Sequence, residues 1–106
     1  MRIRKETDNM NSEELELVAT ASDALAHPAR VAIFRYIYTA NMRREPVCNK
    51  TLVEATGYAQ ATVSQHMSKL TGSGLVEAQK KGTSAFYYVN VGLLAQYLAA
   101  VKKLNA

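Results

Sequence analysis

The spacing of apolar residues changes twice along the chain. They recur every three or four positions up to about residue 71, alternate over 75–90, and then return to the helical period. The first spacing predicts helices and the second predicts strands. The pattern indicates helices over about 12–26, 28–39, 50–56, 60–71 and 92–104, and strands over 75–81 and 84–90 that Gly82 and Thr83 join. The predicted order is therefore α-α-α-α-β-β-α, a mainly α chain with a small β-hairpin (α+β).

Local signals mark several helix ends. Ser12 is an expected N-cap, because three glutamates follow it in the first turn, and Asn49 is a second expected N-cap. Pro28 suits the first turn of a helix, where its missing N–H costs nothing. Gly57 suits the residue after a helix, which often adopts a left-handed conformation.

Composition excludes several classes of protein. The chain has 106 residues, of which 48% are hydrophobic, so we expect one folded domain over 12–106 after a mobile polar segment, 1–11. No apolar run reaches the roughly 18 residues that a membrane span needs, and the first residues lack the apolar core of a signal peptide. The expected location is the cytoplasm, with no membrane partner. The single cysteine, Cys48, excludes an intrachain disulfide.

Charge is unevenly distributed along the chain. The formal net charge is +4. Residues 12–30 carry four acids and one arginine, whereas residues 57–91 carry three lysines and one glutamate. This balance permits a polyanionic partner for the second half of the chain but does not require one.

The helix predicted at 60–71 has a narrow apolar stripe and an unusual outer face. Val63, Met67 and Leu70 are expected to pack inward, and most of the other positions carry short hydrogen-bonding side chains and no acid. A helix that enters the DNA major groove needs a slim face with donors and acceptors and without acids near phosphates. A short helix and a turn at Gly57 precede it, and this arrangement predicts a helix-turn-helix.

The following hairpin is basic and has a glycine at its tip, as in the wing of a winged helix-turn-helix. A polar helix face is usually only solvated, so the prediction rests on the combination of turn glycine, acid-free helix, Gly-Ser-Gly break and basic hairpin. The expected readers of base edges are Gln60, Thr62, Ser64 and Gln65. The expected contacts to the DNA backbone, from the helix and the wing, are Ser68, Lys69, Lys80, Lys81 and Thr83.

Two stretches of sequence, LAHPARVAIFRYI and TLVEATGYAQATVSQHMSKLTGSGLVEAQKKGTSAFYYVN, resemble the ArsR family of small bacterial winged-helix repressors. The likeness runs from about Leu25 to Asn90. It implies a homodimer that binds a palindromic operator in double-stranded DNA through the 60–71 helix and the 75–90 wing and represses transcription. It also implies that the first and last helices form the dimer interface.

Both end helices do carry apolar stripes that so short a chain would struggle to bury alone. The same stripes could instead close the core of a single protomer. The residues expected at the dimer interface are Leu15, Val18, Leu25, Leu94, Tyr97, Leu98 and Val101.

The chain departs from the family pattern just before the 60–71 helix. Ala59 stands where the family often has a serine. Loss of that capping hydroxyl costs about 1 kcal/mol and leaves open which residue leads the helix into the groove.

Many family members sense metals, but the residues of this chain do not match their sites. One family site is a Cys-x-Cys-x-x-Cys cluster, and the matching positions here are Pro46, Cys48 and Thr51. One soft ligand does not make a thiolate site. The other family site uses Asp and His on the last helix, and residues 90–106 contain neither. We expect no metal and no other cofactor, and a small-molecule effector of unknown identity remains open.

The two histidines and the cysteine have simpler interpretations than metal ligands. His27 is interpreted as a helix-end residue, and His66 as a structural or phosphate-contacting residue. Most single cysteines are passive, but a redox switch at Cys48 is an alternative. Its thiol pKa would be lowered by nearby cations, which are Arg43, Arg44 and Lys50.

Two other classes of function are less consistent with the sequence than DNA binding. A winged helix can serve as a protein-interaction scaffold, and acids on the groove-facing helix would favour that, but it has none. An enzyme is not expected, because the chain shows no glycine-rich phosphate loop, no paired carboxylates and no nucleophile–base arrangement.

Overall fold

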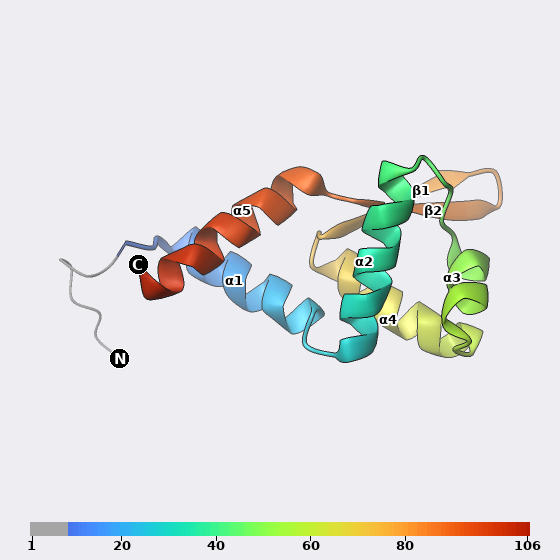
Figure 1. Ribbon diagram of the computed structural model, residues 1–106, viewed down its shortest axis with the longest axis horizontal. Helices are drawn as coiled ribbons and strands as arrows, with labels where there is room; N and C mark the ends of the chain where they lie inside the picture. Colours follow the sequence, from blue (N-terminus) through green and yellow to red (C-terminus); the bar gives the residue numbers. More distant parts are fainter. Residues whose placement is uncertain (1–8) are drawn as a thin grey trace.

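The elements follow the predicted order (Figure 1). The computed structural model describes residues 9–106 and confirms the winged helix-turn-helix class. Its elements are α1 (Ser12–Ala24), α2 (Pro28–Met42), α3 (Asn49–Thr56), α4 (Gln60–Gly72), β1 (Val76–Lys81), β2 (Ser84–Val89), α5 (Val91–Lys102) and the 3₁₀ helix η2 (Lys103–Asn105). None of the helices in this described part is both long and apolar enough to cross a membrane.

The molecule is elongated, with extents of 51 × 24 × 20 Å. Figure 1 shows α1 and α5 side by side at one end, which we call the arm, and α2, α3, α4 and the hairpin at the other, which we call the body. An ion pair of 2.7 Å between Lys103 Nζ and Glu14 Oε2 joins η2, which directly follows α5, to the first turn of α1. The arm therefore projects from the body as a pair of helices.

Two predicted helix caps were wrong by one residue. The N-cap of α1 is Asn11, whose Oδ1 accepts from Glu14 N at 2.8 Å while Glu14 Oε1 accepts from Asn11 N at 3.1 Å. This capping box satisfies the donors that Ser12 was expected to cap, and Ser12 is the first helical residue instead. Asn49 is likewise the first residue of α3, and its Oδ1 accepts from Tyr87 Oη at 2.8 Å. Most of the segment expected to be mobile, 1–11, lies outside the described residues.

The core of the body joins the apolar faces of α2, α3, α4 and the start of β1. Val63, Met67 and Leu70 are buried, as predicted, and attach α4 to the body. Each such side chain stabilises the fold by about 1.5–3 kcal/mol when it leaves water. The largest fully buried side chains are Ile33, Ile37, Val47, Leu52, Val63, Leu70, Leu75 and Val76.

The wing is held to the body by the side chain of Asn41. Asn41 Oδ1 accepts from Val89 N at 2.8 Å, and Asn41 Nδ2 donates to Tyr87 O at 3.2 Å. Tyr87 N also donates to Val47 O at 2.9 Å. These bonds occupy the edge of β2 that does not face β1. Helix α2 accordingly continues to Met42, beyond its predicted end at residue 39.

We predict opposite effects for alanine at two glycines. A Cβ at either Gly57 or Gly72 would meet no atom within 4 Å, but Gly57 has φ +74° whereas Gly72 lies in the last turn of α4. Gly57→Ala should lower the free energy of unfolding by about 1–2 kcal/mol, because a Cβ is strained in the left-handed region. Gly72→Ala should raise it by up to about 1 kcal/mol. Urea unfolding followed by circular dichroism tests both, and equal effects would contradict this explanation.

Candidate DNA-binding surface

A short turn sets α4 against α3. Gly57 N donates to Val53 O at 2.9 Å, and the left-handed conformation of Gly57 ends α3. Thr56 Oγ1 donates to the backbone of α3 and accepts from Tyr58 N at 3.1 Å, which fixes the next residue of the turn. Ala59 then precedes α4 without a side-chain cap, so the helix begins at Gln60 with no capping hydroxyl. The two helices and this turn form the predicted helix-turn-helix.

The outer face of α4 is slim. Positions that are 3–4 residues apart share a helix face, and the stripe opposite the buried side chains consists of Ala61, Gln65, Ser68 and Gly72. All four residues are exposed. A face made of one glutamine and three small residues lets the backbone of a helix approach another surface closely. It also leaves one long amide side chain to select what it meets.

The four predicted base readers all lie on α4, but not on one stripe. Gln65 is exposed at the centre of the outer face, and Ser64 is exposed beside it. Gln60 is exposed at the start of the helix, where it borders a hollow with Lys50, Val53 and Glu54 of α3. Thr62 is only half exposed. Contacts between these residues and bases stay a prediction.

Two predicted backbone contacts lie at the end of α4 that borders the arm. Lys69 Nζ forms an ion pair of 3.3 Å with Asp23 Oδ2 of α1, and both side chains are exposed. Ser68 borders the same hollow as Thr20 and Asp23. An exposed pair of this kind contributes about 0–1 kcal/mol, so a DNA phosphate can compete with the carboxylate for Lys69.

The other predicted backbone contacts, Lys80, Lys81 and Thr83, are exposed at the tip of the wing. Lys81 Nζ donates to Tyr88 Oη at 3.3 Å and lies 5.8 Å from the ring centre of Phe86. These contacts hold the Lys81 ammonium against β2 while leaving it in solvent. The tip therefore offers two cations and a hydroxyl to an anionic partner.

Comparison with known proteins identifies the family. The helix-turn-helix domain family matches residues 25–79. The chain is also 30% identical over 98 residues to the helix-turn-helix-type transcriptional regulator Rv0081 of Mycobacterium tuberculosis, across 92% of this chain and 82% of that protein. The chain belongs to the helix-turn-helix transcriptional regulators. The matched relatives are transcriptional regulators rather than enzymes.

Solved structures agree with the fold of this regulator. An ArsR-like transcriptional regulator from Rhodococcus sp. RHA1 superposes with a TM-score of 0.73 at 18% identity, over 87% of this chain and 82% of that one. A second neighbour is the homodimeric winged helix-turn-helix DNA-binding domain Mb0332 of Mycobacterium bovis, a possible ArsR-family regulator. It superposes with a TM-score of 0.68 at 25% identity, over 98% of this chain and 89% of that one. The predicted resemblance to the ArsR family of winged-helix regulators is thereby confirmed.

The residues predicted for a dimer interface lie on the arm of the regulator or next to it, and they differ in burial. Leu25, Leu94 and Tyr97 pack against the core of the same protomer, and Tyr97 Oη lies 2.9 Å from Ser22 Oγ. Leu15 and Leu98 instead remain 44% and 51% exposed. The remaining members, Val18 and Val101, are half-buried. A role in the core of one protomer therefore accounts for part of the set, and the dimer interface stays a prediction for the rest.

The family's metal sites do not fit the residues of this regulator. Pro46 and Thr51 cannot supply the thiolates that accompany Cys48 in the cysteine site. Within residues 9–106, no three His, Cys, Asp or Glu side chains lie close enough together to share a metal ion.

The thiol of Cys48 has a lowered pKa, for a reason that the sequence did not suggest. The main cause is Thr51, whose Oγ1 lies 3.4 Å from Cys48 Sγ and accepts from Cys48 N at 3.3 Å. Lys50 lowers the pKa less, and the expected contributions of Arg43 and Arg44 are not among the causes. The hydroxyl at the start of α3 therefore matters more than the nearby cations.

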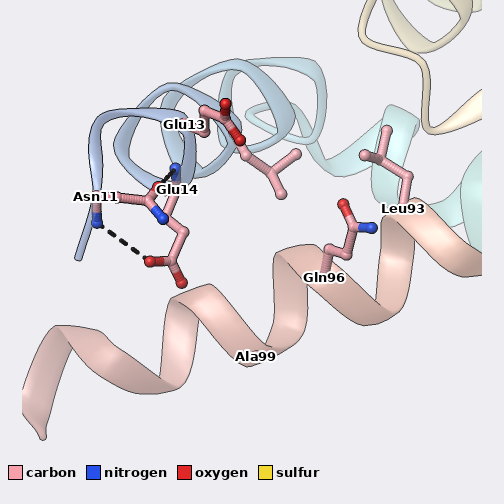
Figure 2. Close-up of a pocket in the computed structure, with 7 residues that line it drawn as sticks. Asn11, Glu13, Glu14, Leu93, Gln96 and Ala99 are labelled. Atoms are coloured by element: carbon pink, nitrogen blue, oxygen red, sulfur yellow. Dashed lines mark hydrogen bonds between the residues drawn. The ribbon is translucent and has the colours of Figure 1, made fainter. Parts of the chain in front are cut away.

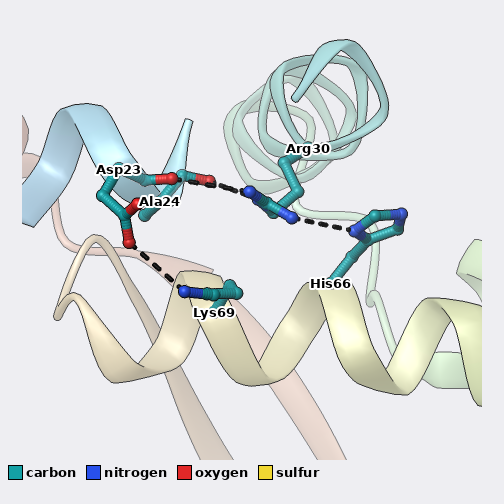
Figure 3. A network of polar contacts seen from close by, with 5 residues as sticks. All are labelled: Asp23, Ala24, Arg30, His66 and Lys69. Carbon is teal, nitrogen blue, oxygen red and sulfur yellow. Dashed lines mark hydrogen bonds and ion pairs between the residues drawn. The ribbon is translucent and has the colours of Figure 1, made fainter. Parts of the chain in front are cut away.

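The network that joins α4 to the arm was not predicted from sequence (Figure 3). Arg30 Nη1 lies 3.4 Å from His66 Nδ1, and the ring of His66 lies 5.0 Å from that of His27. His27 Nδ1 accepts from Ala29 N at 3.0 Å and caps α2, which confirms its interpretation as a helix-end residue. Arg30 and His66 are 36 residues apart, and no local pattern in the sequence links them.

The environment of His66 favours its neutral form. Burial is the main cause of its lowered pKa, and the charges of His27 and Arg30 lower the pKa further. A guanidinium can only donate, so a hydrogen bond from Arg30 requires an unprotonated Nδ1 on His66. The lowered pKa and the hydrogen bond are therefore consistent with each other.

We predict that His66→Gln flattens the pH dependence of stability. Since the pKa of His66 is lowered on folding, its contribution to stability is fully present above the unfolded value of 6.5 and decreases as the pH falls below it. When the pH is lowered from about 8 to about 5, the melting temperature should fall less in the variant than in the wild type. His27→Asn, which can keep the cap of α2, is the matched control. Equal slopes in wild type and His66→Gln would contradict the prediction.

Proposed function

We propose that this regulator is a cytoplasmic homodimer that binds a palindromic operator in double-stranded DNA and represses transcription. The observation that carries the proposal is the slim, acid-free outer face of α4, which a helix-turn-helix presents beside a basic wing. A glutamine amide can pair with adenine in the major groove, and small hydroxyl side chains can donate or accept at other base edges.

The proposed contacts divide into two classes. Base edges are read from α4 by Gln60, Thr62, Ser64 and Gln65, with Gln65 at the centre. Phosphates are bound along the side of α4 and at the wing by Ser68, Lys69, Lys80, Lys81 and Thr83. Phosphate contacts set affinity and register, whereas the contacts to bases set sequence preference.

The arm supports the proposal of a dimer. Leu15 and Leu98 expose large apolar surfaces on α1 and α5, and a two-fold axis at the arm would cover both. Mb0332, whose fold this chain shares, is a homodimeric DNA-binding domain. Two copies of α4 related by such an axis would meet half-sites about 34–36 Å apart, one turn of the DNA helix.

The inducing signal is proposed to be something other than a metal at the known family sites, because the residues needed for those sites are missing. A small-molecule effector would find a hollow of about 420 Å³ in the arm (Figure 2). Leu17 and Leu93 give it apolar walls, and Gln96 and Glu13 give it polar groups. The other lining residues are Asn11, Glu14 and Ala99.

A redox-responsive repressor is the second candidate. The lowered pKa of Cys48 favours it, because the thiolate is the form that reacts with oxidants. Cys48 precedes α3, which packs against α4 in the helix-turn-helix. DNA binding measured by fluorescence anisotropy before and after oxidation tests this candidate. Oxidation should change the affinity of the wild-type protein and leave that of Cys48→Ser unchanged if Cys48 is a redox switch.

The first test is fluorescence anisotropy on DNA from upstream of the protein's own gene, with random duplex as competitor, at two salt concentrations. We expect salt-sensitive binding that prefers the upstream DNA. Gln65→Ala should lose about 1–3 kcal/mol of that preference. Lys81→Ala should lower the affinity for both DNAs equally, and should reduce the slope of log affinity against log salt concentration by about one. Thr39→Ala, at an exposed position of α2 outside the proposed contacts and the effector hollow, is the control.

Two results of this measurement would contradict the proposal. If Lys81→Ala changed only sequence preference, Lys81 would not be a phosphate contact. If wild-type protein bound both DNAs weakly and equally, the winged helix would be better explained as a scaffold for a protein partner.

A separate prediction concerns the dimer. Leu98→Glu places a charge on the exposed apolar surface of α5, so it should convert the dimer to a monomer without unfolding it, because Leu98 is half exposed within one protomer. Sedimentation velocity measures the change. Gln79→Glu, which adds the same charge on the exposed wing strand, should leave the dimer intact. A wild-type monomer at all concentrations would overturn the proposed assembly.

A further inference from the structure

One guanidinium lies where the arm meets the body. Arg30 comes from the first turn of α2, and its Nε donates to Ala24 O at the end of α1 at 2.7 Å. Its Nη2 lies 3.5 Å from Asp23 O, and its Nη1 lies 3.4 Å from His66 Nδ1 on α4. Figure 3 shows the side chain between these partners. A single residue of α2 therefore contacts both the arm helix α1 and the proposed recognition helix α4.

The end of α1 needs such a partner. The last carbonyls of a helix have no N–H donor within the helix and carry partial negative charge. The last turn of α1 contains no basic residue of its own, so Arg30 supplies the positive charge from another element. The planar guanidinium holds its donors at fixed angles, so the direction set by Ala24 determines where Nη1 meets His66.

Apolar packing of α1 against the core is non-directional. The fully buried residues of α1 are Ala21 and Ala24, whose methyl side chains bury little area, and Leu17 and the C-cap residue Leu25 pack against the core while partly buried. The ion pair between Lys69 and Asp23 is a second link from α4 to α1, but both side chains are exposed. The bonds of Arg30 are thus the more directional connection between α1 and α4.

We propose that Arg30 is a positioning residue for operator recognition, because it fixes the angle between α1 and α4 by bonding the end of α1 and His66 together. This inference rests on the proposed dimer that binds DNA through α4. In such a dimer the angle sets the separation of the two recognition helices, and half-sites in DNA match only one separation. Loss of Arg30 therefore relaxes the spacing of half-sites that the dimer accepts, and leaves the contacts to each half-site in place.

The state of His66 controls this link. The bond from Arg30 needs a neutral imidazole with its proton on Nε2, and protonation of Nδ1 replaces the acceptor with a donor. The charged or titratable groups around His66 are His27 and Arg30 from α2, Tyr58 from the turn, Lys69 from α4, and Asp23 from α1, which is paired with Lys69. Among the groups of residues 9–106 around it, a protonated His66 would thus face Arg30 with no unpaired carboxylate to offset the repulsion.

The test uses operator duplexes whose half-sites are at the native separation, or one base pair closer or further apart. Wild-type protein should prefer the native spacing by about fivefold or more. Arg30→Ala should reduce that preference to about twofold or less, with little change on a duplex carrying one half-site. Arg35→Ala removes the same charge from an exposed position of α2 and should behave as wild type.

Two further readouts separate positioning from a general structural role. Arg30→Lys keeps the charge and the fold but cannot reach both Ala24 O and His66, so it should also lose the spacing preference. This variant decides the matter if Arg30→Ala does not fold. The preference of wild-type protein should decline as the pH falls and His66 gains a proton, whereas Arg30→Lys should show no such decline. Nitrogen NMR shifts of His66, measured without DNA, should place its proton on Nε2 in the wild type.

Different failures have different meanings. Operator binding with an unchanged spacing preference in Arg30→Ala and Arg30→Lys would overturn this inference alone. So would a uniform loss of affinity at every spacing, or a proton on Nδ1 of His66. Equal binding of wild-type protein to operator and random DNA would overturn the proposed function, and this inference with it.

Discussion

Burial of Val63, Met67 and Leu70 against the body determines what the rest of α4 can do. Once these three side chains face inward, the helical period places Gln65 and Ser68 outward and His66 and Lys69 toward the arm. A shift of the buried stripe by one residue would rotate α4 by about 100° and exchange these roles. The chemistry of the outer face is therefore a consequence of packing. Substitutions that loosen the core should first change the orientation of α4.

The uneven charge of the sequence becomes a set of pairings in the structure. The acids of α1 are divided between its two ends, where Glu14 pairs with Lys103 of the arm and Asp23 pairs with Lys69 of α4. Lys103 also contributes to lowering the pKa of the Glu14 carboxyl. The Lys69–Asp23 pair is exposed and contributes little stability, whereas the Glu14–Lys103 pair is partly buried. Their positions at both ends of α1 help to orient that helix. The cations of the wing stay exposed, away from these acids.

The regularly spaced features were predictable from sequence, and the long-range polar contacts were not. The change of period marked the hairpin, and Gly57 and Ala59 marked the end of α3 and the uncapped start of α4, because each depends on a few neighbouring residues. Asn41 lies beyond the predicted end of the second helix at residue 39, and nothing near it in sequence shows that its amide bonds to β2. The pairing of Arg30 with His66 is equally invisible, because it depends on how three helices meet.

Asn41 also affects how the regulator behaves at high concentration. An exposed strand edge can pair with a strand of another chain and begin aggregation. In this hairpin, Asn41 and Val47 occupy backbone groups on the outer edge of β2, while β1 carries the charges of Glu77, Lys80 and Lys81. Charged side chains and occupied edges both discourage strand addition. The residues that make the wing basic thus also keep many copies of the protein from joining edge to edge.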